Sequence, residues 1–157
     1  MLEQSFNEVY EKFKLRFYKG VFELVRERHG SLSAMEAFSL EVIHILDHPT
    51  IGQFADFLNI SQSNATYKVN SLIRKGYIIR EHSRKDRREY HLSLSDKYYN
   101  YISLLSDYQK TVMGRIKERF SPQDVEMFDR MLTVMSSELM PECTLEANTA
   151  APEETQS

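Results

Sequence analysis

Hydrophobic residues recur every three or four positions over the first 25 residues of the chain. They are Phe6, Val9, Tyr10, Phe13, Phe17, Val21 and Leu24. In an α-helix this spacing places all of them on one face, so the pattern predicts a long amphipathic helix. A second helix is expected to begin after Ser33, because Ser33 and Glu36 have the spacing of a capping box. It should end near Asp47, since Pro49 disfavours a helical conformation at the residue before it.

Two short helices joined by a tight turn are predicted next. Thr50 can cap the helix "IGQFADFL", and Asn59 tolerates the left-handed backbone conformation needed to end it. Ser61 is a good N-cap for the helix that follows, and Gly76 is its C-terminal stop. The apolar side of that helix carries Ala65, Val69, Leu72 and Ile73. Together with the small Ala55, which lets the two helices cross closely, this pattern predicts a helix-turn-helix.

The hydrophobic period then changes from helical to strictly alternating. The segments "YIIREH" and "YHLSLS" alternate on either side of the charged "SRKDRRE", which predicts two antiparallel strands with a basic loop at the tip. From Asp96 the helical period returns, in a stripe made of Tyr98, Ile102, Leu105, Val112, Ile116 and Phe120. Ser121 and Pro122 begin a last helix, whose apolar face carries Val125, Phe128, Leu132, Met135 and Leu139. The acidic segment past Met140 is short of large apolar residues and is expected to be disordered.

Charge is unevenly distributed along the chain, although the net value is only −3. Residues 61–90 hold eight cations and three acids, whereas the remaining residues hold 12 cations and 20 acids. A basic block on an acidic body favours a polyanionic partner more than the total charge suggests. The alternative is that the charged run is a solvated loop with no partner at all.

Several classes of protein are disfavoured by what the sequence lacks. No basic segment followed by an apolar run occurs in the first 30 residues, and no run of 18 apolar residues occurs anywhere. We therefore expect neither a signal peptide nor a membrane span, which favours a cytoplasmic location. The single cysteine, Cys143, cannot form an internal disulfide. No Gly-rich phosphate loop, nucleophile motif or pair of catalytic carboxylates is recognisable, so we expect neither an enzyme nor a bound cofactor.

The order of these elements, with the hairpin reading "KDRREYHLSLSDK", resembles the multiple-antibiotic-resistance regulator (MarR) family of bacterial winged-helix transcription factors. That family has an Asp-x-Arg wing followed by apolar alternation and a Leu-Thr/Ser step into the next helix. The resemblance covers roughly residues 5–140 and is most specific over 51–97, where "LNISQSNATYKVNSLIRKGYI" matches the family's recognition-helix region. Two positions depart from the family pattern: Tyr98 stands where glycine is usual, and Lys68 where an aliphatic residue is common.

The resemblance implies a mainly α fold with a small β-hairpin wing. In this fold a winged helix-turn-helix is joined to long N- and C-terminal dimerisation helices. Residues 1–32 would form the N-terminal dimerisation helix and 33–95 the DNA-binding lobe. Residues 96–140 would form the C-terminal dimerisation helices, followed by the acidic tail 141–157.

The same resemblance implies that the partner is double-stranded DNA. It also implies roles for the polar residues. The helix after Ser61 would enter the major groove, with base-reading candidates Gln62, Ser63, Asn64, Thr66, Tyr67 and Lys68. Arg88 would enter the minor groove at the tip of the wing, and Asp86 would hold that arginine and the loop in place. The candidate phosphate contacts are Arg74, Lys75, Arg84, Lys85 and Arg87. The alternative for the helix is a polar face that is merely solvated.

A homodimer is expected because the apolar faces of the first and the last two helices exceed what a small lobe can cover. Such a dimer would bind a pseudo-palindrome with half-sites about one helical turn apart. The alternative is a monomer in which these helices fold back. Family members typically hold a small effector between the dimer helices and the DNA lobe. The candidate residues for an aromatic or acyl effector are Phe13, Phe17, Phe38, His44, Tyr98, Tyr101 and Tyr108, although aromatics at helical spacing also build plain cores.

Other functions remain open at this stage. A metal site at His44 and His48, with Glu41 nearby, is not expected, because no second cluster of ligands follows in the next long helix. The family resemblance favours a repressor, with an activator as the alternative. A winged-helix protein-interaction module would use the basic hairpin to bind an acidic protein. A sequence-indifferent architectural DNA binder would keep the phosphate contacts but would not discriminate between base sequences.

Overall fold

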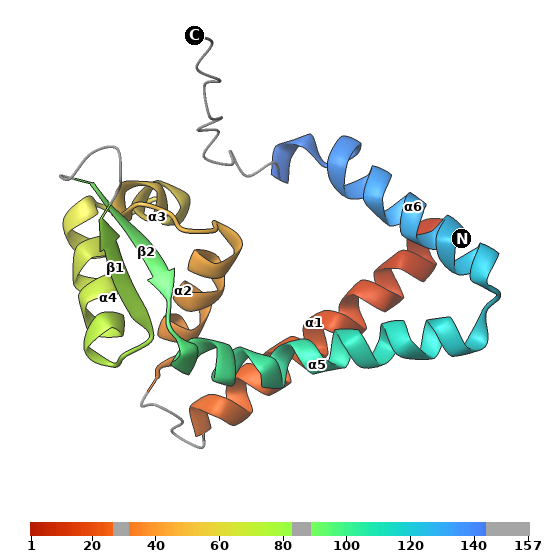
Figure 1. Ribbon diagram of the computed structural model, residues 1–157, viewed down its shortest axis with the longest axis horizontal. Coiled ribbons are helices and arrows are strands. Elements are labelled where there is room, and N and C mark those ends of the chain that lie inside the picture. The colour runs from red at the N-terminus through yellow and green to blue at the C-terminus, as the bar shows by residue number, and fades with distance from the viewer. Residues whose placement is uncertain (27–31, 83–88, 144–157) are drawn as a thin grey trace, which may run out of the picture. The chain divides into compact units, whose positions relative to one another are not determined.

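The computed structural model describes residues 1–26, 32–82 and 89–143, apart from the side chains of residues 24 and 101–106 (Figure 1). The chain divides into two units, residues 1–113 and 114–157. The elements are α1 (Leu2–Arg26), α2 (Ala34–Ile45), α3 (Ile51–Leu58), α4 (Gln62–Arg74), β1 (Ile78–His82), β2 (Tyr90–Leu94), α5 (Asp96–Arg119) and α6 (Pro122–Glu138). This order confirms the predicted winged helix-turn-helix flanked by long helices. No helix in the described segments is both long enough and apolar enough to cross a membrane.

The starts of the helices follow the predicted capping residues. The Ser33 hydroxyl accepts a hydrogen bond from the Glu36 N–H, and the Ser33 N–H donates one to the Glu36 carboxylate, which completes the capping box of α2. Thr50 forms a second box with Gln53 at the start of α3. Ser61 caps α4 through the Asn64 N–H. Because each cap satisfies N–H groups that have no partner inside the helix, these boundaries could be predicted from the local sequence.

The turn between α3 and α4 brings the two helices close together. Asn59 adopts the predicted left-handed conformation with φ of 52°. The following Ile60 N–H donates to the Ala55 carbonyl at 3.1 Å. Ala55 and Ala65 are 3% and 0% exposed, and small side chains at such a crossing allow the helix axes to approach. The structure therefore confirms the helix-turn-helix and the role of Ala55 in it.

The core of the first unit lies between α2, α3, α4 and the hairpin. Its largest fully buried side chains are Tyr77, Tyr98, Phe54, Leu40, Ile43, Leu72, Leu92, Val21 and Val69. The C-terminal part of α1 contributes Val21, whereas Phe6, Val9 and Tyr10 near its start are each about half exposed, at 51–52%. The predicted apolar face of α1 is therefore only partly used inside this unit.

Strands β1 and β2 form an antiparallel hairpin in which Ile78 is opposite Leu94 and His82 is opposite Tyr90. The base of the hairpin is attached to the segment before α3. The Leu92 N–H donates to the Pro49 carbonyl at 2.8 Å, and the His48 ring bonds to the Ser93 hydroxyl at 2.9 Å. His48 has φ of 55°, so the residue before Pro49 avoids the right-handed helical region by adopting the left-handed one.

In the second unit, Ser121 caps α6 and Pro122 occupies its first turn, as predicted. None of the 17 residues of α6 is buried. Its predicted apolar face is open, with Phe128 39%, Leu132 37% and Leu139 68% exposed. A short 3-10 turn, Pro141–Cys143, follows α6. It is closed by a hydrogen bond from the Cys143 N–H to the Met140 carbonyl. This turn lies in the segment for which the sequence predicts disorder. Residues 144–157 lie outside the described part of the chain.

Candidate nucleic-acid interface

Helix α4 presents a polar surface opposite its buried side. Ala65, Val69 and Leu72 are fully buried against the core. The six candidate base readers all lie outside this buried side: Gln62, Ser63, Asn64 and Tyr67 are exposed, and Thr66 and Lys68 are half-buried. The aromatic side chain of Tyr67 is 71% exposed. The anchoring of α4 thus comes from its apolar positions, which leaves the polar ones available for a partner.

Hydrogen bonding distinguishes four of these six residues, the hydroxyl side chains of Ser63 and Thr66 from the carboxamides of Gln62 and Asn64. The Thr66 hydroxyl donates to the Gln62 carbonyl at 2.8 Å, and the Ser63 hydroxyl lies 3.1 Å from that of Ser61. Both short side chains are therefore engaged with the first turn of their own helix. Within the described residues, the carboxamides of Gln62 and Asn64 make no side-chain hydrogen bond. These two are the side chains best placed to bond an external group.

A row of side chains, which sequence reasoning did not find, connects α4 to the hairpin. The Arg80 guanidinium donates to Asn70 Oδ1, and it lies 6.0 Å from the centroid of the Tyr90 ring. The Tyr90 and His82 rings lie 4.3 Å apart between centroids. Strand alternation could have placed Arg80 and His82 on one face of β1, but it could not reveal the contact with α4.

The tip of the wing lies outside the described residues. This tip includes the five residues Arg84, Lys85, Asp86, Arg87 and Arg88, so their predicted roles at DNA and in support of the loop stay predictions. The described strands end at His82 and resume at Tyr90, which are paired across the hairpin.

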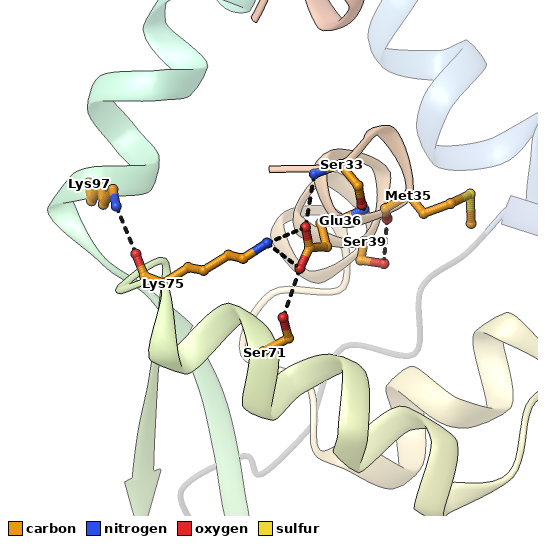
Figure 2. Close-up of polar contacts among 7 residues, drawn as sticks. All are labelled: Ser33, Met35, Glu36, Ser39, Ser71, Lys75 and Lys97. Atoms are coloured by element: carbon orange, nitrogen blue, oxygen red, sulfur yellow. Dashed lines mark hydrogen bonds and ion pairs between the residues drawn. The ribbon is translucent and has the colours of Figure 1, made fainter. Parts of the chain in front are cut away.

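The two cations at the end of α4 differ from each other. Arg74 is exposed, in keeping with a phosphate contact. Lys75, by contrast, is only 28% exposed in its side chain, and its ammonium lies 2.7 Å from the Glu36 carboxylate of α2 (Figure 2). The prediction for Lys75 as a phosphate contact did not anticipate this internal ion pair, because Glu36 is 39 residues earlier in the sequence.

Glu36 is the centre of a polar cluster between α2 and α4. Its side chain is 19% exposed, and burial by itself raises the pKa of its carboxyl. Hydrogen bonds from Lys75, the Ser33 N–H and Ser71 outweigh that effect and lower the pKa from its ordinary value of 4.5 to about 2. Glu36 is therefore charged in the folded protein at any pH near neutrality.

Acidification from pH 5 to pH 2 is expected to destabilise the wild-type protein more than a Glu36→Gln variant. Because the folded-state pKa is lowered, the contribution of this carboxylate to stability is fully present above 4.5 and is lost as the pH falls through about 2. Glutamine preserves the capping box but does not titrate. The measurement is the urea midpoint of both proteins at pH 5, 4, 3 and 2, and parallel losses in the two proteins would contradict this role of Glu36.

The structure joins the candidate effector residues in pairs. The ring centroids of Phe13 and Tyr108 lie 5.9 Å apart, those of Phe17 and Phe38 lie 6.3 Å apart, and those of His44 and Tyr98 lie 5.6 Å apart. The side chain of Tyr101 lies outside the described residues.

Tyr98 is a core residue of the first unit. It is fully buried, and its hydroxyl donates to Glu41 Oε1 at 3.2 Å. Burial raises the pKa of Glu41, and the bond from Tyr98 counteracts part of that shift. The assignment of Tyr98 to an effector pocket stays a prediction, and in this structure its large side chain is part of the core.

An open cleft of about 360 Å³ occurs in the second unit and contains none of the candidate effector residues. It is lined by Ile116, Phe120, Asp124, Val125 and Phe128, at the junction of α5 and α6. Four of these five residues are apolar. Phe128 belongs both to the lining of this cleft and to the exposed apolar face of α6.

Comparison with known proteins identifies relatives of the chain. A sequence profile of the MarR family matches residues 31–89. The uncharacterized HTH-type transcriptional regulator YkoM of Bacillus subtilis is 25% identical over 134 residues, which cover 79% of this chain and 86% of that protein.

Solved structures share the fold over most of the chain. A MarR family protein from Bacillus stearothermophilus superposes with a TM-score of 0.60 at 17% identity, covering 88% of this chain and 92% of that one. FabT of Streptococcus pneumoniae, solved in complex with DNA, superposes with a TM-score of 0.56 at 24% identity, covering 88% of this chain and 97% of that one. These likenesses establish a winged-helix fold of the same type.

Proposed function

We propose that the chain is a DNA-binding transcriptional regulator of the MarR family, whose profile matches residues 31–89, and that it binds a specific pseudo-palindromic operator as a homodimer. The observation that carries this proposal is the polar surface of α4. The carboxamides of Gln62 and Asn64 are exposed in the first turn of the helix. FabT, whose fold is similar, is solved bound to DNA, which supports a corresponding use of α4 here.

Recognition would divide between the two grooves. The first turn of α4 enters the major groove, where the carboxamides of Gln62 and Asn64 can each bond the N6 and N7 atoms of an adenine. Arg88 enters the minor groove, where narrow A·T tracts concentrate negative potential. The exposed Arg74, together with Arg84, Lys85 and Arg87 of the wing, neutralises phosphates and supplies affinity without reading sequence.

A second copy of the chain would cover the open apolar surfaces. Helix α6 has no buried residue, and Phe128, Met131 and Leu132 on it are 37–61% exposed. Exposed apolar surfaces of this kind are typical of an interface. The two-fold axis of a homodimer presents two α4 helices to half-sites about one helical turn apart, roughly 34 Å. Binding over a promoter would make the protein a repressor.

An aromatic or acyl effector would relieve DNA binding by changing the spacing of the two α4 helices. The half-buried rings of Phe13 and Tyr108, in contact edge to face, support a site between α1 and α5. Phe17, Phe38 and His44 are the other candidates that the structure leaves at least partly exposed. An effector of this kind would bind mainly by apolar contact, with few polar groups to orient it.

Selection of bound sequences from a randomised duplex pool tests this function. The purified protein is expected to retain a two-fold-symmetric motif flanked by A·T pairs. The A·T preference should fade with Arg88→Ala, because this residue reads the width of the minor groove. A Phe128→Glu variant should lose the two-fold symmetry, since it places a charge in the proposed dimer surface. Ser137→Glu is the matched control and should keep the symmetric motif, because Ser137 lies about two and a half turns from Phe128, on the opposite face of α6.

Two outcomes would contradict the proposal in different ways. Retention of DNA that depends on salt but yields no motif would indicate a sequence-indifferent architectural binder. Failure to retain any DNA, even at low salt, would indicate that the basic hairpin binds a protein partner.

A further inference from the structure

The C-terminal end of α4 is tied to the start of α2 by one carboxylate (Figure 2). Glu36 Oε1 accepts hydrogen bonds of 2.8 Å from both the Ser71 hydroxyl and the Lys75 ammonium. Glu36 Oε2 accepts from the Lys75 ammonium at 2.7 Å and from the Ser33 N–H at 2.8 Å. Both oxygens are thus used twice, and two of the donors belong to α4 or its C-cap.

The turn that follows α4 is held from the opposite side by the start of α5. The Lys97 ammonium donates to the Lys75 carbonyl at 2.8 Å and lies 4.6 Å from the centroid of the Tyr77 ring. The Ser95 hydroxyl donates to the Gly76 carbonyl at 2.6 Å. Gly76 itself has φ of 81°, a conformation that glycine adopts without strain. The last turn of α4 therefore has fixed contacts with both α2 and α5.

Lys75 would have to give up this pair in order to reach a phosphate. Glu36 is only 19% exposed, so withdrawal of the ammonium would leave a largely buried carboxylate without its cation. Removing one partner of such a pair lowers the stability by more than the intact pair contributes to it, because the remaining charge is poorly solvated. The ion pair is thus expected to persist when α4 binds a partner.

We propose that Glu36 and Lys75 are positioning residues for operator binding, whose ion pair sets the angle at which α4 enters the major groove. This inference rests on the proposed DNA-binding function. Base readers at the N-terminal end of α4 must be placed within a fraction of an ångström to bond base edges, whereas phosphate contacts tolerate more freedom. The pair acts at the opposite end of the 13-residue helix and touches no DNA.

Salt dependence separates positioning from phosphate contact. Binding to the selected operator and to random duplex is measured by fluorescence anisotropy at several salt concentrations. The variants are Lys75→Met, Glu36→Gln and the double variant, in the full-length chain. Each single variant is expected to weaken operator binding by about tenfold, and the double variant no further, because both remove the same interaction. Binding to random duplex and the slope of log K against log salt should stay those of the wild type.

Arg74→Met is the matched control, because Arg74 is the exposed cation directly before Lys75. Loss of one phosphate contact should reduce the slope of log K against log salt by about one. It should weaken binding to the operator and to random duplex alike. Lys75→Arg keeps the charge and can bond both carboxylate oxygens, so it should restore binding. Ser71→Ala removes one bond from Glu36 without removing a charge and gives a milder version of the same loss, should Glu36→Gln fail to fold.

The opposite pattern would overturn the inference. If Lys75→Met lowers the salt slope by about one while Glu36→Gln and Ser71→Ala bind like the wild type, Lys75 contacts phosphate and the pair positions nothing. A wild-type protein that shows no preference for any operator would instead defeat the proposed function itself, and the positioning role with it.

Discussion

Replacing Phe54 with alanine is expected to lower the free energy of unfolding of the first unit by about 3–5 kcal/mol. Phe54 is 0% exposed on α3, in the core that also contains Leu40, Leu72 and Leu92. The change removes most of a buried aromatic ring and leaves a cavity between α3 and its neighbours. Since small domains are stable by only about 5–15 kcal/mol, this loss is a large part of the total.

Phe57→Ala is the matched control, because it makes the same chemical change on the same helix. Phe57 is 56% exposed, so Phe57→Ala should lower the free energy of unfolding much less than Phe54→Ala does. The measurement is urea denaturation followed by circular dichroism, with operator binding measured on the same samples. Equal destabilisation by the two substitutions would show that α3 does not pack as described.

Replacing either Gln62 or Asn64 with alanine is expected to cost about 1–3 kcal/mol in binding to the operator and little in binding to random duplex. Both carboxamides lie exposed in the first turn of α4 and make no side-chain hydrogen bond within the described residues. Their removal should therefore leave the fold intact. A base that loses its bidentate partner is no longer distinguished from the others, so the selected motif should relax at one position in each half-site.

Gln109→Ala controls for the loss of an exposed carboxamide away from α4, since Gln109 lies exposed on α5. It should bind both DNAs like the wild type. Affinities for operator and random duplex are compared at one salt concentration, because the phosphate contribution varies with salt. If Gln62→Ala and Asn64→Ala weaken binding to the operator and to random duplex equally, neither residue reads a base.

Much of the fold could be predicted because its boundaries depend on neighbouring residues. Ser33, Thr50, Ser61 and Ser121 each cap a helix, and every one of these caps bonds to a backbone N–H three residues later. The alternation that predicted the hairpin is likewise a property of consecutive residues. Patterns that involve only neighbouring residues can be recognised in the sequence without any knowledge of the tertiary structure.

The candidate site was predicted only in part. The polar side of α4 followed from its helical period, since the positions that are not buried must face outward. Its internal bonds did not follow, and they distinguish Gln62 and Asn64 from Ser63 and Thr66. The contact of Arg80 with Asn70 was missed for the same reason, because it joins a strand to a helix.

By itself, the sequence determined the kinds of elements, their caps, the helix-turn-helix and the concentration of cations near the hairpin. Only the tertiary structure revealed the contacts of Lys75 and Tyr98. A lysine at the end of a helix has the same local pattern whether it faces a phosphate or Glu36, 39 residues earlier. A tyrosine in an apolar stripe has the same period whether it lines a cleft or is fully buried beside Glu41. Local periodicity reports which face a residue occupies, whereas its partner depends on which distant segment packs against that face.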